Sequence, residues 1–488
     1  MHRKFITNLI LLLSLNLLIK PFWILGIDRS VQNMVGLEDY GFYSVIFNFS
    51  FLFNILLDLG ITNFNTRNIA QNKQLLNKHF SGIISIRFLL ALLYVSVTFI
   101  AALALGYRGE QLYLLGWIAF NQFLLSSILY LRSNISGLLM LRTDSLISVL
   151  DRSLMIIFCA ILLWGNVTSQ PFRIEWFVYA QTAAYLLTAL IALSIVVVKA
   201  KFKKIYWNWP FFVMIVKRSL PFATLVLMMS FYNRIDPVLI ERLLPYPEGD
   251  IQAGVYAQAF RLFDAANQIA YLFAVLLLPI FSHLIKQGKE IVSMVKLAFS
   301  LLFAVSVSVA VTSFFYASDL MHLLYPEKNI ENSSLIFSIL MFGFIAVSGI
   351  YVFGTLLTAN GSLKQLNIIA AFAIIFNLTV NIILIPKIQA VGSAYASLSA
   401  QFISVILQVI VVQRIFKFRI NLRYLASLAL FAALVVLGAW FSRQLHYSWW
   451  INAAMVLAYS FILASLLRLF NIRGLIAMVR ERESEPPE

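Results

Sequence analysis

Residues 334–358 read SLIFSILMFGFIAVSGIYVFGTLLT, a run of 25 residues without one charged side chain. A helix of about 20 mostly apolar residues is long enough to cross the roughly 30 Å hydrocarbon core of a bilayer. A surface helix of a soluble protein would carry a charged face, which this run lacks. The run therefore predicts a transmembrane helix.

Thirteen further stretches of similar length and character lie on either side of this one. The predicted spans cover residues 5–27, 41–60, 81–106, 112–131, 146–164, 174–198, 219–240, 254–285, 291–317, 334–358, 365–386, 391–413, 422–441 and 449–470. The whole chain of 488 residues is 61% hydrophobic and 12% charged, against about 45–50% apolar and about 25% charged in soluble domains. We therefore predict an all-α polytopic membrane protein with about 14 transmembrane helices.

The basic residues predict the orientation of these spans, because Lys and Arg accumulate in short cytoplasmic loops. With the N-terminus inside, the inside segments hold 24 Lys and Arg residues and the seven outside loops hold one each. Both termini are then predicted to be cytoplasmic. Most of the net charge of +16 follows from this topology, so we expect no nucleic-acid partner.

Sequence motifs of catalysis or metal binding are missing. Cys159 is the only cysteine, the five histidines have no metal-ligand spacing, and the sequence has no Walker loop and no nucleophile elbow. We therefore expect no enzyme activity, no metal and no cofactor.

An internal repeat appears when the chain is shifted by 213 residues. The shift places Ile27-Asp28-Arg29 over Ile240-Glu241-Arg242, and Gly41-Phe42-Tyr43-Ser44 over Gly254-Val255-Tyr256-Ala257. Because the shift equals six spans, an even number, the two copies run parallel, and transporters are often built from such repeats. The repeat predicts two six-helix lobes related by a parallel pseudo-two-fold, with an extra C-terminal helix pair.

The corresponding boundaries follow from the spans. We expect an N-lobe over residues 1–200, a C-lobe over 201–416, the extra helix pair over 417–470, and a cytoplasmic tail over 471–488.

Three basic residues lie deep in the predicted spans, namely Lys20, Arg234 and Arg261. Lys20 and Arg234 each lie 15 residues into a span, roughly 23 Å from its inner end. A charge in the middle of a bilayer costs about 2.5–3.5 kcal/mol on insertion scales, so such residues usually face a cavity or a partner. Guanidinium and ammonium groups suit phosphate. These three residues are therefore candidate ligands of a diphosphate.

Further polar residues and two prolines accompany these cations. The candidates for a polar cavity or for ion coupling are Asp236, Asp264, Gln268 and Asn48, and the candidate hinges are Pro21 and Pro237. Residues 261, 264 and 268 follow the i, i+3, i+7 spacing that places them on one helix face. Asp236 and Asp264 could instead neutralise the neighbouring arginines in structural ion pairs, and both alternatives stay open.

Four more charged residues lie toward the cytoplasmic ends of their predicted spans. We expect Arg87, Arg132 and Arg152 to extend their charged groups to the membrane surface. Asp58, at the inner end of its span, is expected to contact Arg67 or lipid headgroups.

Two stretches resemble a known family. VGLEDYGFYS at 35–44, with LDLGI at 57–61 and RNIA at 67–70, resembles the opening of polysaccharide-biosynthesis flippases. NLTVN at 377–381, continuing through Ile385-Pro386 to VGSAYA at 391–396, is similar to the pattern of that family's spans 11 and 12. The family belongs to the multidrug/oligosaccharidyl-lipid/polysaccharide exporter superfamily.

This resemblance implies a two-lobed transporter with alternating access. Members move polyprenyl-diphosphate-linked oligosaccharides from the cytoplasmic to the periplasmic leaflet without ATP hydrolysis, for the synthesis of surface polysaccharides such as O-antigen, capsule or exopolysaccharide. Basic residues in spans 1, 7 and 8 line the cavity in relatives, and Lys20, Arg234 and Arg261 occupy comparable places here. The implied location is the bacterial inner membrane, and implied partners are membrane lipid, a polysaccharide polymerase and a chain-length regulator.

Two other functions remain as alternatives. A cation-coupled multidrug exporter has the same fold, but such exporters usually have 12 spans and carboxylates in the N-lobe cavity, whereas span 1 here offers Lys20 and no acid. A membrane-embedded polymerase or ligase of the same pathway would carry long extracytoplasmic loops. The longest predicted outside loop has about 16 residues, which disfavours that class.

Overall fold

The structure of the chain is a computed structural model. It describes residues 15, 18–19, 21–62, 65, 69, 74–138, 140–165, 170–200, 209–288, 290–326, 330–418 and 421–469. Two compact units divide these residues, unit 1 up to Ala257 and unit 2 from Gln258 onward.

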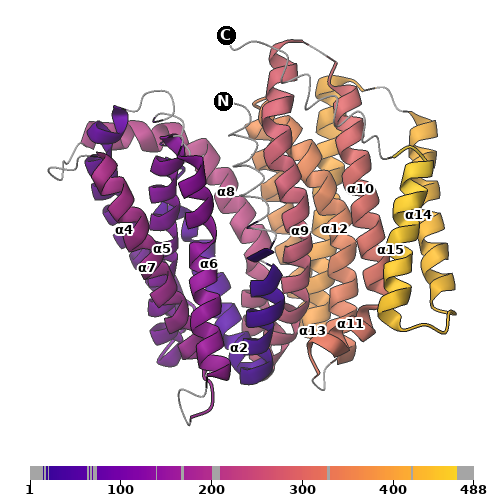
Figure 1. Cartoon of the computed structure of the whole chain (residues 1–488), viewed down its shortest axis with the longest axis horizontal. Coiled ribbons are helices and arrows are strands. Elements are labelled where there is room, and N and C mark those ends of the chain that lie inside the picture. The colour runs from indigo at the N-terminus through magenta and orange to yellow at the C-terminus, as the bar shows by residue number, and fades with distance from the viewer. Residues whose placement is uncertain are drawn as a thin grey trace. The chain divides into compact units, whose positions relative to one another are not determined.

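Unit 1 is a bundle of long helices. Its elements are η1 (Trp23–Asp28), α2 (Arg29–Leu52), η2 (Asn54–Leu57), α4 (Leu75–Ala104), α5 (Glu110–Gly137), α6 (Leu141–Trp164), α7 (Ile174–Ala200), α8 (Trp209–Leu243) and the start of α9 (Glu248–Lys286). Helices α5, α6 and α7 pack side by side, and α2 packs against α5, α7 and α8 (Figure 1). A cluster of buried apolar side chains from α4, α5 and α7 joins these helices at one end of the unit.

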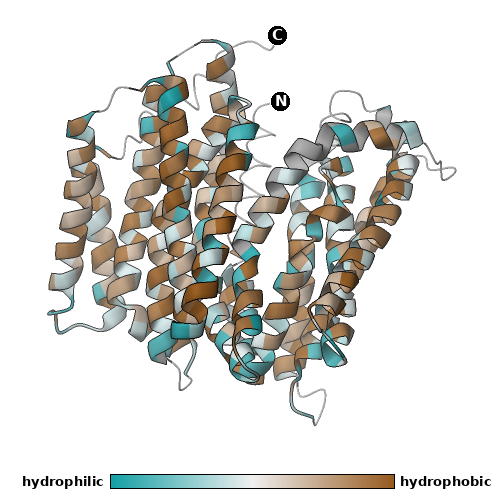
Figure 2. Cartoon of the chain, turned by 180° about the vertical axis from the view of Figure 1, so that it is seen from behind, coloured by the Kyte–Doolittle hydropathy of each residue, from teal (hydrophilic) through white to brown (hydrophobic). Residues whose placement is uncertain are grey.

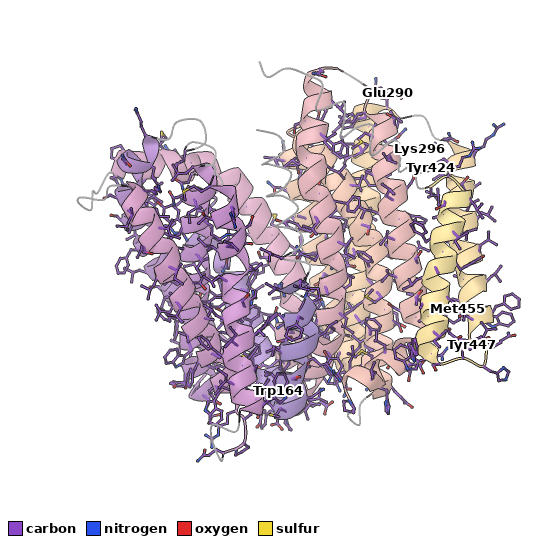
Figure 3. All side chains as sticks on the ribbon, in the orientation of Figure 1. Trp164, Glu290, Lys296, Tyr424, Tyr447 and Met455 are labelled. Atoms are coloured by element: carbon purple, nitrogen blue, oxygen red, sulfur yellow. The ribbon has the colours of Figure 1, made fainter. Side chains whose placement is uncertain are left out.

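Unit 2 is a second bundle. It contains the rest of α9, then α10 (Val292–Phe315), α11 (Ala317–Leu324), α12 (Ile330–Ala359), α13 (Leu363–Phe416), α14 (Leu422–Ser442) and α15 (Trp449–Leu466). Helix α12 packs between α10 and α13, and the pair α14–α15 packs on α10. Figure 3 shows Lys296 and Tyr424 together at one end of this pair and Tyr447 at the other end. The Nζ of Lys296 lies 4.7 Å from the ring centroid of Tyr424.

The predicted spans coincide with helices wherever the structure describes them. Among the described residues, nine helical segments are long and apolar enough to cross a membrane. Helix α13 is one of the nine, and it contains two predicted spans, because Ile388 and Gln389 break it. Gln389 has a φ of 51°, which a helix cannot accommodate. The all-helical membrane fold is confirmed, and the count of 14 stays a prediction.

The surface of the bundle is more apolar than a water-exposed surface would be. Large side chains on α4 such as Phe88, Leu92 and Ile100 are exposed, while Arg87 and Thr98 on the same helix are buried. Hydrophobic residues follow the helices along their length and hydrophilic residues gather at their ends (Figure 2). Exposed apolar surface of this extent marks a membrane-facing region, and the chain is a multi-pass membrane protein.

Helices α2 and α9 cross at two glycines within unit 1. A Cβ atom on Gly41 would collide with the backbone carbonyl of Asp250, and one on Gly254 would collide with that of Leu37. Leu37 and Asp250 are 213 positions apart, as are Gly41 and Gly254. The contact is therefore reciprocal under the shift that relates the two copies of the repeat.

Candidate functional site

The candidate residues of the first span lie at the edge of the described chain. Lys20 lies outside the described residues. Pro21 is exposed and lies in the helical turn before η1, the π-helical segment Trp23–Asp28. Proline removes one backbone donor, and π-helical turns occur often at functional sites. The hinge at Pro21 stays a prediction.

Arg234 and Asp236 lie near the end of α8. The Cζ of Arg234 lies 5.0 Å from the ring centroid of Phe51 on α2, a cation–π distance. Asp236 is only 1% exposed, and its carboxylate accepts a hydrogen bond of 2.8 Å from the hydroxyl of Tyr256. Asp236 is therefore held from α9 by a tyrosine. Pro237, the candidate hinge that follows it, is buried.

The candidates of span 8 lie on α9 in unit 2. Helix α9 is unbroken from Glu248 to Lys286, so Arg261, Asp264 and Gln268 share one face, as their spacing predicts. All three are half-buried. This face thus combines a cation, an anion and an amide at intermediate exposure.

Asn48 lies on α2 and is 6% exposed. Its Nδ2 donates to the carbonyl of Ser44 at 2.7 Å, one turn earlier in the same helix. Its Oδ1 is buried and has no hydrogen-bond partner among the described residues. A buried acceptor without a partner costs about 1–3 kcal/mol, which keeps Asn48 among the candidates.

The expectation that Arg87 and Arg132 reach the membrane surface is wrong. Arg87 is 6% exposed, donates to Asp58 at 2.8 Å and donates to the hydroxyl of Ser126 at 2.6 Å. Arg132 donates to Asp144 at 2.8 Å. Each guanidinium finds a carboxylate from another part of the chain, and pairing inside the protein replaces contact with headgroups. Asp58 therefore contacts Arg87 and not the expected Arg67 or headgroups.

Arg152 also lies elsewhere than expected. Helix α6 begins at Leu141, five residues before the predicted span, so Arg152 lies 11 residues into a helix of 24, roughly 16 Å along its axis. The Cζ of Arg152 lies 5.7 Å from the ring centroid of Trp23 and 5.9 Å from that of Tyr185. It is thus a cation at mid-helix, which the sequence did not single out because the helix start was placed too late.

A buried carboxylate was missed at the end of η1. Asp28 is 3% exposed, and the hydroxyl of Tyr40 lies 3.0 Å from each of its carboxylate oxygens. The expectation of a first span without an acid counted residues only to 27. Because the helix continues through Asp28 into α2, the acid lies inside unit 1. Its place opposite Glu241 in the repeat was the available signal.

A group of titratable residues surrounds the connection between α8 and α9, outside the predicted spans. Arg242 lies 2.9 Å from Glu241 by its Nε, and its Cζ lies 4.1 Å from the ring centroid of Tyr107. Burial, opposed by Arg242 and reinforced by Asp250, raises the pKa of Glu241 to about 7. Burial and the charge of Glu38 raise the pKa of Asp250 to about 6.

These shifts predict a loss of stability as the pH rises. A carboxyl group with a raised pKa stabilises the folded state fully below its unfolded pKa, and this contribution is lost as the pH rises through the folded pKa. The unfolded values are 4.5 for Glu241 and 3.8 for Asp250, so the melting temperature should fall between about pH 4 and pH 7. Glu241→Gln should reduce this fall and raise the melting temperature at pH 8. Thermal unfolding of the purified protein across this range measures the effect. The exposed Glu110 at the start of α5 is the matched control, and equal pH profiles for Glu241→Gln and Glu110→Gln would contradict the assignment.

Among the described residues, no group of three His, Cys, Asp or Glu side chains could hold a metal ion. The features that remain are cations and amides placed inside long apolar helices.

The family comparison agrees with this picture. Residues 6–285, more than half of the chain, match the model of the family described as polysaccharide biosynthesis protein. The chain belongs to this polysaccharide biosynthesis protein family. The match covers the described helices from η1 to α9, and with them Arg234, Arg261 and the crossing of α2 with α9. The comparison with curated proteins gave no match.

Solved structures show which fold the family member has. The lipid II flippase MurJ in an inward-closed conformation is similar with a TM-score of 0.70, at 15% identity, over 96% of this chain and 100% of that chain. An inward-facing multidrug resistance MATE transporter of the MOP superfamily is similar with a TM-score of 0.62, at 14% identity, over 81% of this chain and 93% of that one. A MOP-superfamily transporter from Pyrococcus furiosus follows with a TM-score of 0.55, at 14% identity, over 83% and 92%.

At these identities the likeness concerns the fold. The polysaccharide biosynthesis protein has the fold of MOP-superfamily transporters, as the resemblance of its motifs predicted. The similar structures are those of a flippase and of transporters, not of enzymes, and the expectation of a transporter is confirmed.

Proposed function

We propose that this protein moves a polyprenyl-diphosphate-linked oligosaccharide from the cytoplasmic to the periplasmic leaflet by alternating access, for the synthesis of a cell-surface polysaccharide. The observation that carries the proposal is the placement of half-buried Arg234 and Arg261 within long apolar helices of a polysaccharide biosynthesis family member. The similarity of the fold to a lipid II flippase supports a lipid-linked substrate.

The substrate must bring anionic groups to these cations. A diphosphate carries oxygens that two guanidinium groups can bind with bidentate, charge-assisted hydrogen bonds. Arg234, Arg261 and Lys20 are assigned to the diphosphate. Asp236, Asp264, Gln268 and Asn48 are assigned to the polar wall or to ion coupling, and Pro21 and Pro237 to the bending of their helices.

The same proposal places the protein in its cell. The location is the bacterial inner membrane with both termini in the cytoplasm, because the predicted inside loops hold 24 basic residues and the outside loops seven. A polymerase and a chain-length regulator are the proposed partners, since a flipped repeat unit must be polymerised. The lobes are proposed at residues 1–200 and 201–416, the helix pair at 417–470 and the cytoplasmic tail at 471–488.

A cation-coupled multidrug exporter is the second candidate function. It is favoured by Asp28, a carboxylate buried in unit 1 beside Tyr40, because a buried acid can bind a proton or a cation. It is opposed by Arg152 and Arg234 among the helices of the same unit, since they would repel a cationic drug.

Depletion of the protein in its native host tests the proposal. Lipid-linked glycans should accumulate in the inner leaflet as diphosphate esters, because synthesis continues while translocation stops. Extraction followed by leaflet-specific labelling and mass spectrometry measures this pool and identifies the glycan. An unchanged pool accompanied by new sensitivity to cationic drugs would favour the exporter instead.

A further inference from the structure

Unit 1 contains three arginines within its helices, and one of them differs from the other two. Arg87 and Arg132 each donate to a carboxylate at 2.8 Å. The nearest carboxylate to Arg152 is that of Asp151, whose Oδ2 lies 3.8 Å from the Nε, beyond the range of a hydrogen bond. The guanidinium fork of Arg152 is therefore not closed by a bidentate carboxylate from the described residues.

The side chain of Arg152 lies on the protein-facing side of α6. Met155 and Cys159, at the i+3 and i+7 positions of the same face, are both 0% exposed. The lipid-facing side of the helix carries the exposed Ile157 and Ile161. Yet the side chain of Arg152 retains 27% exposure. A partly exposed cation on a protein-facing side, half-way along a membrane helix, is the placement expected beside a water-filled cavity.

Aromatic groups hold this guanidinium in place. The rings of Trp23 and Tyr185 lie within cation–π distance, and the hydroxyl of Tyr185 lies 3.3 Å from Nη1. Tyr185 is 11 residues into α7, so it meets Arg152 at mid-helix from the opposite end of the bundle. Trp23 is held in turn by stacking on Phe177 at 5.8 Å. These contacts use the faces of the rings and one N–H group, and they leave the remainder of the fork for a planar anion.

We propose that Arg152, positioned by Trp23 and Tyr185, is an anion-binding site of unit 1 that binds the diphosphate of the transported lipid. The proposal rests on the proposed function and adds a binding residue on α6 to those on α8 and α9. It assigns Arg152 a role that the closed pairs of Arg87 and Arg132 exclude for those two arginines.

Binding to the full-length purified protein in nanodiscs tests this site. The probe is undecaprenyl diphosphate without a glycan, and undecaprenol, which has the same chain and no phosphate, is the matched probe. Arg152→Met should weaken binding of the diphosphate by about tenfold or more, the effect of losing a charge-assisted contact, and leave binding of undecaprenol unchanged. Arg152→Lys should fall between the two, because it keeps the charge and loses the fork. Arg142→Met removes an exposed charge from the same helix and should bind like the wild type.

The outcomes separate this site from the proposed function. Wild-type affinity for undecaprenyl diphosphate in both Arg152→Lys and folded Arg152→Met would overturn the assignment of Arg152 and leave the proposed function standing. A wild-type protein that does not bind the diphosphate lipid would overturn the proposed function itself. Displacement of the probe by phosphatidylglycerol would assign Arg152 to ordinary anionic lipid and overturn the proposal, whereas displacement by inorganic diphosphate alone would support it.

Discussion

Export of surface polysaccharide should fall at least about tenfold when Arg234 or Arg261 is replaced by alanine, because each loses a charge-assisted contact of about 1.5–3 kcal/mol. Lys20→Ala should act in the same direction. Protein level should remain unchanged, since each of the two arginines is half-buried. Quantified surface polysaccharide, normalised to the amount of membrane-inserted protein, measures the effect.

Lysine substitutions provide the matched control for charge. Arg234→Lys and Arg261→Lys keep the positive charge but not the bidentate geometry, so they should retain more export than the alanine variants. The half-buried Arg132, which pairs with Asp144, serves as a control position whose loss should act through folding and lower protein level. Full export by all three alanine variants at Lys20, Arg234 and Arg261 would rule out a cationic translocation path.

The crossing of α2 with α9 should be intolerant of any side chain. In Gly41→Ala or Gly254→Ala the added Cβ would overlap a backbone carbonyl of the facing helix, and backbone atoms cannot rotate away as a side chain can. The helices must separate, at a cost of about 1–3 kcal/mol for overpacking. We expect a lower melting temperature and loss of export for each variant, measured by thermal unfolding in detergent and by surface polysaccharide.

Gly116 on α5 is the matched control for this crossing. The nearest atom to a Cβ at Gly116 is the Cζ of Phe99 at 3.9 Å, an ordinary van der Waals contact, so Gly116→Ala should retain the wild-type melting temperature. Wild-type stability in Gly41→Ala would mean that α2 and α9 do not approach as closely as the structure places them.

The candidate site could be predicted from the sequence only in part. Arg261, Asp264 and Gln268 follow a helical spacing, and an unbroken α9 is enough to place them on one face. Asp236 was considered as a partner of Arg234, but its described hydrogen bond comes from Tyr256, twenty residues later. Asp58 was assigned to Arg67 or headgroups, and Arg87 is the residue that binds it. Partner choice depends on which helices are neighbours, and hydropathy contains no term for that.

The sequence by itself determined the membrane class, the helices and the family motifs, because the free energy of placing a segment in a bilayer is a sum over its own residues. The repeat at an interval of 213 was also legible in the glycines and tyrosines that the two copies share. Only the tertiary structure decided that Arg152 lies against Trp23 and Tyr185, that Asp28 is buried beside Tyr40, and that Gly41 meets Asp250. Each of these contacts joins helices separated in sequence, and their geometry follows from helix packing rather than from any local property of the chain.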